Sequence, residues 1–570
     1  MEERKIKGTE ALLLSLLGEG VDTVFGYPGG TIMPFYDNIY DYKDKIEHIL
    51  VRHEQGAVHA AEGYARTTGK VGVCIATSGP GATNFITGIA DAMMDSTPIV
   101  CITAQVNVEK LGTDFFQEAD MIGITIPITK WSYLITKAAE IPQVIAKAFH
   151  IAKSGKPGPV VLSLTKNAQV ELMSFSGYKR TDYIKNPIKP AVEINFDKVH
   201  KAAELLNKAE KPLIIAGHGI TISEAEDELK DLAEKGNIPV ATTLMGISCI
   251  PTEHPLYVGK VGMHGNIAPN AMTQQADVIL AIGMRFSDRV TGEVEGYAPN
   301  AQIIHVDIDE TEINKNVQVE LPIVGDAKNI LSEIIPYIKY KERTEWFKYE
   351  DELATKEYGM IIRPKLLSEK EEIFMGQVVD SVSRNANHSA IIVTDVGQNQ
   401  MFSARYAKFR QKRSWVTSGG LGTMGFGLPA AIGAKMGNKE RDVIAIVGDG
   451  GFQMNIQELG TIMQSNIGVK IVLLNNSFLG MVRQWQELFF NRKYAFTELD
   501  NPDFQKIAKA YRIPCNRVTK HSELEKAVQK MIKAKGSYLL EVAVLEEENV
   551  FPMIPAGCTL NDIIYDKPNK

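Results

Sequence analysis

The chain has little cysteine for its length and no CxxC pair. Its 570 residues include five cysteines at scattered positions: Cys74, Cys101, Cys249, Cys515 and Cys558. Three of them lie in or beside apolar runs, so we expect buried reduced thiols rather than disulfides or zinc ligands.

Two further absences concern location and partners. No apolar run approaches the roughly 20 residues of a membrane span, and the start, MEERKIKGTEALLLSLLGEG, lacks the pattern of a signal peptide. The net charge of -7 and the pI near 6.0 show no basic excess for binding nucleic acid. We therefore expect no membrane and no nucleic-acid partner, and a cytoplasmic protein, or an organellar one if a transit peptide once preceded the chain.

Length and patterning indicate several α/β domains. A chain of 570 residues suggests about three or four domains. Three blocks of short apolar runs alternate with helical patterns, which predicts mainly parallel sheets with helices on both faces. We predict domains at 1–175, 193–340 and 373–550 and a tail at 551–570, with polar connectors at 175–192 and 340–372. The first and third blocks are similar in size and rhythm.

The most informative motif is VIAIVGDGG, followed by VKIVLLNN. It places Asp449 and Asn476 at the carboxyl ends of two neighbouring parallel strands, joined by a helix at 456–465. Ligands bind at such strand ends in open α/β sheets. A carboxylate and an amide oxygen suit Mg²⁺, and nearby glycines let backbone N–H groups approach a phosphate. The alternative is a loop that merely turns.

A second motif, RHEQGAVHAAEGYAR, places Glu54 at a strand-to-helix junction. Its carboxylate could simply stabilise the helix N-terminus, or it could act in proton transfer. His53 and His59 lie six residues apart, which is not the spacing of a zinc-binding HExxH motif, so we reject a zinc site.

Two further segments allow a structural and a functional interpretation. GLGTMG (420–425) is a literal GxGxxG, which alone is weak support for a dinucleotide fold. GMRFSDRVTG (283–292) follows a predicted strand and could be a surface salt-bridge cluster.

Together these strings resemble the thiamine-diphosphate enzymes and, among them, the FAD-containing acetohydroxyacid (acetolactate) synthases. The resemblance runs nearly end to end. The most specific strings are FGYPGG, RHEQGA, TSGPGATN, GTDFFQEAD, RFSDRVTG, GLGTMGFGLPAAIGA, GDGGFQMN and GMVRQWQE. The chain departs from the family pattern at Ser287, where the first Asp of RFDDRVTG is usual, at Asn399, where many relatives have His, and around Lys166.

The resemblance implies thiamine diphosphate, Mg²⁺ and a structural FAD as cofactors. It assigns thiamine diphosphate to Tyr27, Gly30, Glu54, Gly397, Gln398, Asn399, Gly422, Met424, Gly450, Met454, Gly480 and Met481. It assigns Mg²⁺ to Asp449, Asn476 and Phe478. It assigns FAD to Gly217, Thr243, Leu244, Met263, His264, Gly283, Arg285, Asp288, Asp307 and Asp326.

The implied reaction decarboxylates pyruvate on thiamine diphosphate and condenses the hydroxyethyl carbanion with a second 2-keto acid. Pyruvate gives 2-acetolactate and 2-oxobutyrate gives 2-aceto-2-hydroxybutyrate, in branched-chain amino acid synthesis. The implied catalytic residues are Glu54, Gln117, Lys166, Arg289 and Trp485. Glu54 would bond N1′ of the pyrimidine, Arg289 would bind the second acid's carboxylate and Trp485 would wall the pocket for its alkyl group.

The resemblance also implies how the site is assembled. Gly30, Phe116 and Gln117 would line it from the N-terminal domain, and the cofactor would bridge two chains of a homodimer or a dimer of dimers. A small regulatory subunit is a further possible partner.

Two alternatives remain open, and two others are disfavoured. The chain could be a catabolic acetolactate synthase or another pyruvate-using thiamine-diphosphate enzyme, such as a pyruvate oxidase or decarboxylase. FAD in the purified protein would discriminate against the catabolic synthase. Glyoxylate carboligase is disfavoured because it lacks the glutamate supplied here by Glu54, and a non-enzymatic paralogue is disfavoured because Glu54, Asp449 and Asn476 are all retained.

Overall fold

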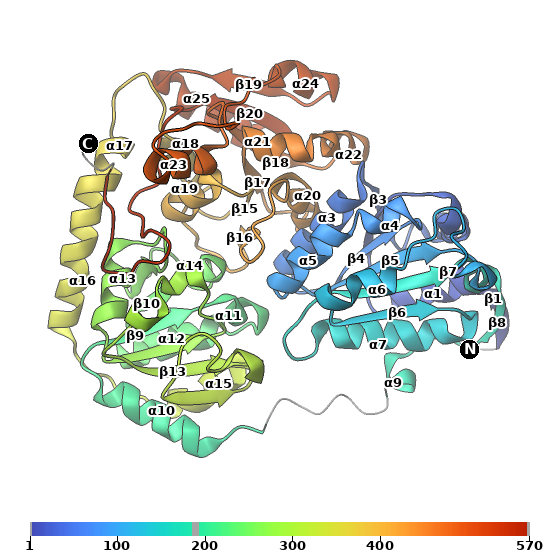
Figure 1. Ribbon diagram of the computed structural model, residues 1–570, viewed down its shortest axis with the longest axis horizontal. Coiled ribbons are helices and arrows are strands. Elements are labelled where there is room, and N and C mark those ends of the chain that lie inside the picture. The colour runs from blue at the N-terminus through green and yellow to red at the C-terminus, as the bar shows by residue number, and fades with distance from the viewer. Residues whose placement is uncertain (1–2, 185–192, 567–570) are drawn as a thin grey trace.

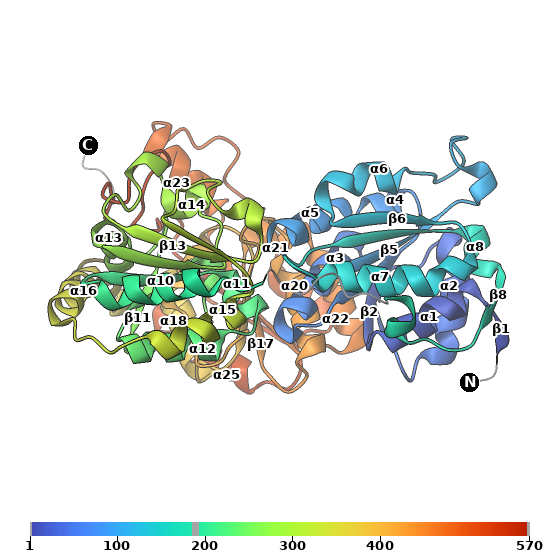
Figure 2. The same cartoon turned by 90° about the horizontal axis from the view of Figure 1, so that it is seen from below.

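The chain folds into three α/β bodies, each built on its own six-stranded sheet (Figure 1). The computed structural model describes residues 3–184 and 193–566. In Figure 1 the N-terminal body lies to the right, the middle body at the lower left and the C-terminal body above it. Figure 2 shows the N-terminal and middle bodies as two lobes side by side. The predicted three-domain α/β fold is confirmed.

The N-terminal sheet is entirely parallel, with the strand order β3-β2-β4-β5-β7-β6. Its strands are β2 (Thr23–Gly26), β3 (Glu47–Leu50), β4 (Gly72–Ala76), β5 (Ile99–Gln105), β6 (Trp131–Ile135) and β7 (Val160–Thr165). Val73 and Ile75 of β4 pack in one core with α1 (Gly8–Gly18) and α7 (Ile141–Lys153). Cys74 and Ala76 pack on the other face with α3 (Glu54–Thr68) and α5 (Ile86–Met94). Both faces are therefore covered, which explains why the strands are apolar runs without alternation.

The C-terminal sheet repeats this topology. Its order is β16-β15-β17-β18-β20-β19, again all parallel. Numbered along the chain, both sheets therefore read 2-1-3-4-6-5, which fits their similar sequence rhythm. The strands are β15 (Ile391–Thr394), β16 (Trp415–Val416), β17 (Val443–Gly448), β18 (Val469–Asn475), β19 (Cys515–Val518) and β20 (Tyr538–Ala543).

The connection between β17 and β18 differs from the single helix predicted at 456–465. It consists of α21 (Asp449–Met454), a 3₁₀ turn η11 (Ile456–Glu458) and α22 (Leu459–Ser465). Helix formation starts at Asp449 despite the poor helix propensity of Gly450 and Gly451. Tertiary packing explains why glycine stands in this helix. Gly451 packs so closely on Asp395 that a Cβ on it would lie 2.2 Å from an oxygen of Asp395.

The middle sheet has a different order, β11-β10-β9-β12-β13-β14, also all parallel. Along the chain it reads 3-2-1-4-5-6, the order of dinucleotide-binding folds, whose ligand sits where the order reverses. Here the order reverses between β9 and β12. The strands are β9 (Pro212–Ala216), β10 (Val240–Thr242), β11 (Tyr257–Lys260), β12 (Val278–Ile282), β13 (Gln302–Asp307) and β14 (Leu321–Val324).

The connectors and the tail tie the bodies together. The first predicted connector includes residues 185–192, which lie outside the described residues. The second contains α16 (Thr344–Glu357) and α17 (Arg363–Leu366), which run along the left edge of Figure 1. The tail returns to the middle body, where the Ile554 amide donates to the Met263 carbonyl at 2.8 Å.

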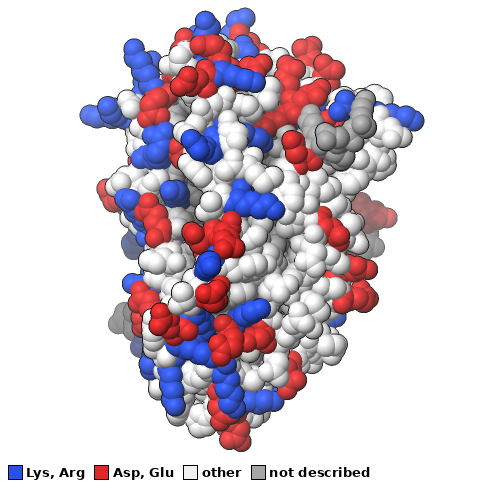
Figure 3. Space-filling view, turned by 90° about the vertical axis from the view of Figure 1, so that its left-hand side faces the viewer, with Lys and Arg blue, Asp and Glu red and all other residues white. Residues whose placement is uncertain are grey.

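The surface of the edge that carries α16 is mixed in charge. Figure 3 shows Lys and Arg interspersed with Asp and Glu over this face. Among the described residues, none of the helices combines the length and hydrophobicity that crossing a lipid bilayer requires.

The N-terminal and C-terminal bodies meet where α3 crosses α20 (Gly427–Gly437). The two backbones approach so closely that a Cβ on Gly433 would lie 1.7 Å from the Ala60 carbonyl oxygen. A Cβ on Gly63 would lie 2.0 Å from the Ala430 carbonyl oxygen. Only glycine fits at these two positions, so α3 is held rigidly against the C-terminal body.

A buried carboxylate fixes the start of α3 from the same body. Glu458 of η11 accepts hydrogen bonds from the backbone amides of Arg52 and His53, both at 3.0 Å, and from the Thr461 hydroxyl at 2.6 Å. It has no exposed surface, and burial raises the pKa of its carboxyl to about 7, against the opposing effects of these donors and of the Arg52 guanidinium. The folded protein therefore holds this group protonated in a pH range where the unfolded chain ionises it.

We predict that Glu458→Gln reduces the loss of stability on going from about pH 5 to about pH 8. The raised pKa of Glu458 gives a stability contribution that is complete below its unfolded value of 4.5 and is lost as pH rises through about 7. The amide keeps an acceptor oxygen but cannot ionise, so the difference in unfolding free energy between the two pH values should shrink by roughly 1–3 kcal/mol. Urea midpoints at both pH values measure this. The exposed Glu440→Gln variant is the control, and equal pH slopes for both variants would contradict the prediction.

Candidate active site

Two cavities open at the carboxyl edges of the middle and C-terminal sheets. The larger has a volume of about 780 Å³ and is lined by all three bodies, with Arg66 and Met94 coming from the N-terminal one. The smaller, of about 60 Å³, lies wholly in the C-terminal body. Both are lined by Val396, Gly397 and Met481, so the two cavities adjoin.

The smaller cavity lies where the strand order of the C-terminal sheet reverses, between β15 and β17 (the switch point of that sheet). The helices α19 (Gln398–Tyr406) and α23 (Gly480–Phe489) begin at its wall, and their free N–H groups favour an anion there. Of the residues predicted to hold thiamine diphosphate or Mg²⁺, ten line it: Gly397, Gln398, Asn399, Met424, Asp449, Gly450, Asn476, Phe478, Gly480 and Met481. Gly422 lines the larger cavity, and Met454 lines neither.

Asp449 and Asn476 follow two strands that pair in parallel, with Gly448 opposite Leu474. Burial raises the pKa of the Asp449 carboxyl to about 6, and the Asn501 side-chain amide donates to Oδ2 at 2.7 Å. The Asn476 side-chain NH₂ is directed to the Glu546 carbonyl and to Gln398 Oε1, both at 3.4 Å. These bonds leave the amide oxygen of Asn476 as the group available to a cation.

These residues fit a divalent cation carrying a diphosphate. A buried carboxylate and an amide oxygen are donors that Mg²⁺ prefers, and a cation would relieve the desolvation of Asp449. The Asn399 side-chain oxygen is buried without a hydrogen-bond partner. Gly397 has φ of +118°, a conformation that L side chains rarely adopt, so its amide can turn toward the cavity floor.

The glycine-rich loop beside this cavity is held by carboxylates that sequence reasoning missed. The Asp395 carboxylate accepts from the amides of Gly425 (3.1 Å) and Gly427 (2.9 Å). Asp95, which directly follows α5, accepts from the amides of Gly419 (2.9 Å) and Gly420 (2.7 Å). The only sequence signal for Asp395 is its position directly after an apolar strand, and Asp95 has none. Together they place Gly422 and Met424.

The larger cavity lies at the switch point of the middle sheet. Nine of the ten residues predicted to contact FAD line it, from Thr243 to Asp326. The exception is Gly217, which follows β9 and packs on the loop after β12, where a Cβ on it would lie 2.2 Å from the Gly283 carbonyl oxygen. Ser287, the departure from the family string, also lines the cavity. The size, the strand order and the close glycine contacts fit a dinucleotide.

The residues predicted to bind the second substrate line the larger cavity. Arg289 is the second residue of the short helix α14 (Asp288–Thr291). Its side chain is largely exposed and forms an ion pair with Asp288 at 3.0 Å. Trp485 of α23 is half-buried and its ring contacts Phe489. Both line the larger cavity, together with Met481.

The N-terminal residues of the predicted site lie elsewhere in this single chain. Neither cavity is lined by Tyr27, Gly30, Glu54, Phe116, Gln117 or Lys166. Glu54 starts α3 and accepts from the Asn84 side chain at 2.9 Å. Gln117 packs against Gly79, and Gly79 and Tyr27 follow the neighbouring strands β4 and β2. These residues thus gather at the carboxyl edge of their own sheet. Lys166 also lies at this edge, because it directly follows β7, and it starts the short helix α8 (Lys166–Val170) with an exposed side chain.

The two histidines rejected as a zinc pair have separate partners. His53 Nδ1 accepts from the Gln55 amide at 3.2 Å, and His59 Nδ1 lies 2.9 Å from Glu62 Oε1.

Comparison with known families follows the same three-part division. The model of the thiamine pyrophosphate enzyme N-terminal TPP binding domain matches residues 6–124, that of the central domain residues 199–334, and that of the C-terminal TPP binding domain residues 395–542.

Several curated proteins match over nearly the whole chain. A probable acetolactate synthase large subunit of Methanocaldococcus jannaschii is 44% identical over 98% of this chain and 95% of its own length. The acetolactate synthase isozyme 2 large subunit of Escherichia coli is 41% identical over 98% of this chain and 99% of its own. The acetolactate synthase large subunit of Corynebacterium glutamicum is 42% identical over 98% of this chain and 90% of its own. The chain therefore belongs to the thiamine pyrophosphate enzymes and, within them, to the acetolactate synthase family.

Proposed function

We propose that the enzyme joins pyruvate, with loss of carbon dioxide, to a second 2-keto acid. The products are 2-acetolactate from pyruvate and 2-aceto-2-hydroxybutyrate from 2-oxobutyrate, and the pathway is branched-chain amino acid synthesis. The observation that carries this proposal is the meeting of the two cavities. The larger cavity, which adjoins the site for the diphosphate at Gly397 and Met481, is lined by the Arg289 guanidinium and the Trp485 indole. A decarboxylase or oxidase needs no second carboxylate-binding group at that point.

Each residue then has a task that its position supports. Thiamine diphosphate supplies an electron sink when it is bound. Asp449 and Asn476 would hold Mg²⁺, with Phe478 beside them, and Gly397, Gln398 and Asn399 would bind the diphosphate. Arg289 would bind the carboxylate of the second acid as a planar fork, and Trp485 would contact its alkyl group.

Glu54 would hold a proton at the pyrimidine nitrogen N1′. The Glu54 that acts at a given site would come from a second copy of the chain. This follows from the single chain, in which neither cavity contains Glu54 or Gln117. Exposed apolar side chains on the N-terminal body, Phe115, Phe116, Ile124 and Ile126, support burial against a partner. We therefore propose a homodimer or a dimer of dimers. The matched relatives are named large subunits, which supports a small regulatory subunit as a further partner.

FAD is proposed as a structural cofactor of the larger cavity. The net reaction transfers no electrons, so its task would be to fill and brace a space lined by three bodies. Asp307, at the end of β13, lines this cavity, and its carboxylate would accept a hydrogen bond from a hydroxyl of the bound FAD. Burial raises the pKa of its carboxyl to about 6.

One assay tests the reaction. Purified protein is incubated with pyruvate, thiamine diphosphate and Mg²⁺, and the product is identified by mass spectrometry; the visible absorption spectrum of the protein reports a flavin. 2-Acetolactate is the expected product. Acetaldehyde or an acetyl product in its place would indicate a decarboxylase or oxidase and overturn the proposal.

A matched pair of isosteric variants separates metal binding from proton transfer. Asp449→Asn removes the charged ligand, so the affinity for thiamine diphosphate with Mg²⁺ should fall by at least roughly 10–100-fold, the cost of losing a supporting metal partner. Glu54→Gln cannot hold the proton at N1′, so turnover should fall by roughly 10²–10⁴-fold while cofactor affinity changes little. Calorimetric titration and initial rates measure both. Tight cofactor binding by Asp449→Asn, or normal turnover by Glu54→Gln, would refute the respective assignment.

A second pair tests the pocket. We expect the wild type to prefer 2-oxobutyrate over pyruvate as second substrate, because one methylene against an apolar wall gives roughly 10–200-fold selectivity. Trp485→Leu should erase most of that preference, whereas Arg289→Lys should lower both products because it loses the planar fork. Competition between the two acids, scored as the product ratio, measures this. An unchanged ratio in Trp485→Leu would show that the indole does not form the pocket.

A further inference from the structure

Helix α23 presents two different faces. Met481 and Trp485 are four residues apart, lie on one face and line the larger cavity. Arg483, Gln484 and Glu487 are the buried residues of the helix. Arg483 and Glu487 are also four residues apart, and Arg483 is rotated by roughly 200° from Trp485, so these two charges lie opposite the cavity face.

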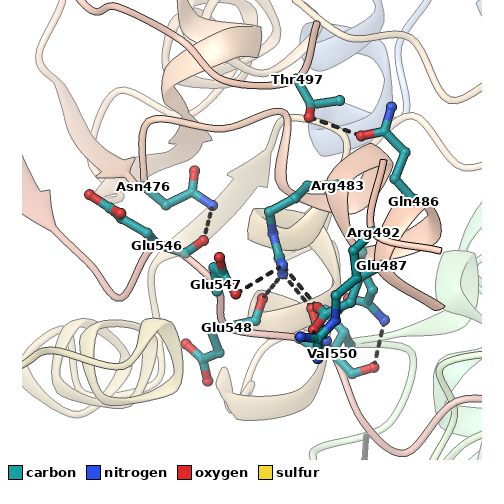
Figure 4. A network of polar contacts seen from close by, with 12 residues as sticks. Asn476, Arg483, Gln486, Glu487, Arg492, Thr497, Glu546, Glu547, Glu548 and Val550 are labelled. Carbon is teal, nitrogen blue, oxygen red and sulfur yellow. Dashed lines mark hydrogen bonds and ion pairs between the residues drawn. The ribbon is translucent and has the colours of Figure 1, made fainter. Parts of the chain in front are cut away.

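Arg483 is completely buried on that opposite face, where both of its Nη atoms have partners while its Nε has none (Figure 4). Its Nη1 forms an ion pair with Glu487 Oε2 at 2.9 Å. Its Nη2 donates to the Glu548 carbonyl at 3.3 Å and to the Asn549 side-chain oxygen. The Asn549 amide in turn donates to Glu487 Oε2 at 2.8 Å, which closes a ring of three side chains. This ring joins the helix to the chain segment 546–550.

The same segment is bonded to Gln484 of α23 and to two residues that line the smaller cavity. The Gln484 side chain bonds both backbone groups of Val550. Its Oε1 accepts from the Val550 amide at 2.8 Å, and its Nε2 donates to the Val550 carbonyl at 3.2 Å. Gln398 donates to the Glu548 carbonyl at 2.6 Å, and Asn476 donates to the Glu546 carbonyl at 3.4 Å. Segment 546–550 therefore fixes α23 relative to the residues that would bind the diphosphate and the metal.

A buried ion pair is a poor source of stability, because removing two charges from water costs about as much as their attraction returns. The planar guanidinium instead fixes the orientation of α23. Its donors reach their acceptors only when the helix has one particular rotation about its own axis. A turn of α23 about its axis would break the bonds to Asn549 and Glu548 and would move Trp485 along the cavity wall.

We propose that Arg483 is a positioning residue for substrate selectivity: it locks the rotation of α23 so that Met481 and Trp485 face the second 2-keto acid. This inference rests on the proposed function, and it assigns the selectivity of the pocket to a residue that does not touch the substrate.

The test uses two variants and a matched control. Arg483→Met removes the anchor and the 2.9 Å partner of the buried Glu487, which keeps the half-exposed Arg492 at 3.4 Å, so it is expected to destabilise the protein. Arg483→Met combined with Glu487→Leu removes both charges and should recover stability without recovering orientation. The control is Arg384→Met, which breaks an ion pair with Asp380 of the same four-residue spacing on an exposed helix face.

The readout is the product ratio in competition between pyruvate and 2-oxobutyrate, with the thermal midpoint measured alongside. We expect the double variant to have a near wild-type midpoint and to lose at least about 3-fold of the 2-oxobutyrate preference, while still making acetolactate; Arg384→Met should keep the wild-type ratio. A purely structural role would change the midpoint and leave the ratio alone. A wild-type ratio in the folded double variant overturns the proposal.

A readout independent of catalysis separates this inference from the proposed function. If the wild type makes neither product, the proposed function is wrong, yet hydrogen exchange of the α23 amides still reports the anchor. Faster exchange over 480–489 in the double variant supports the anchor, and unchanged exchange overturns it.

Discussion

The candidate site depends first on the close crossing of α3 and α20, where glycines replace side chains and two backbones touch. This contact holds the N-terminal body against the C-terminal one at a fixed angle. Because α3 cannot shift, Glu458 can cap its start from the other body, and Asp95, directly after α5, can hold the loop that carries Gly422. One substitution by alanine at Gly433 would place a Cβ 1.7 Å from a carbonyl oxygen, so the two bodies would have to separate.

The sequence predicted the parts of the site that are local. Asp449 and Asn476 follow apolar strands within a few residues, and parallel strands bring such positions to one edge without any further information. The residues around them were not predictable, because their partners are distant in sequence. Asn501 reaches Asp449, Asp395 holds Gly425, and Arg483 meets Glu548 and Asn549. An isolated Asn, Asp or Arg has no pattern that reveals a long-range bond.

The helix that begins at Asp449 shows the same limit at the level of secondary structure. Two glycines in its first turn argue against a helix by propensity alone. The structure forms one because Gly450 packs against Leu479 and Gly451 against Asp395, where larger residues would collide. Apart from the predicted pairing of the strands before Asp449 and Asn476, the strand order of the three sheets was likewise beyond the sequence, since an alternating pattern does not say which strand lies next to which. Only the order, once seen, separates the dinucleotide-type middle sheet from its two flanking sheets.

The larger cavity has a thermodynamic consequence. Its wall draws on all three bodies, from Arg66 in the first to Asp326 in the second and Trp485 in the third. Any ligand held there binds the assembled chain and not the separated bodies, so occupancy opposes their dissociation by mass action. At a ligand concentration 100 times the dissociation constant this linkage amounts to about 2.7 kcal/mol. That is a large share of the roughly 5–15 kcal/mol by which proteins are stable. A ligand bound there would therefore raise the melting temperature as its concentration rises, and the three bodies should unfold as one unit when the cavity is filled and more independently when it is empty.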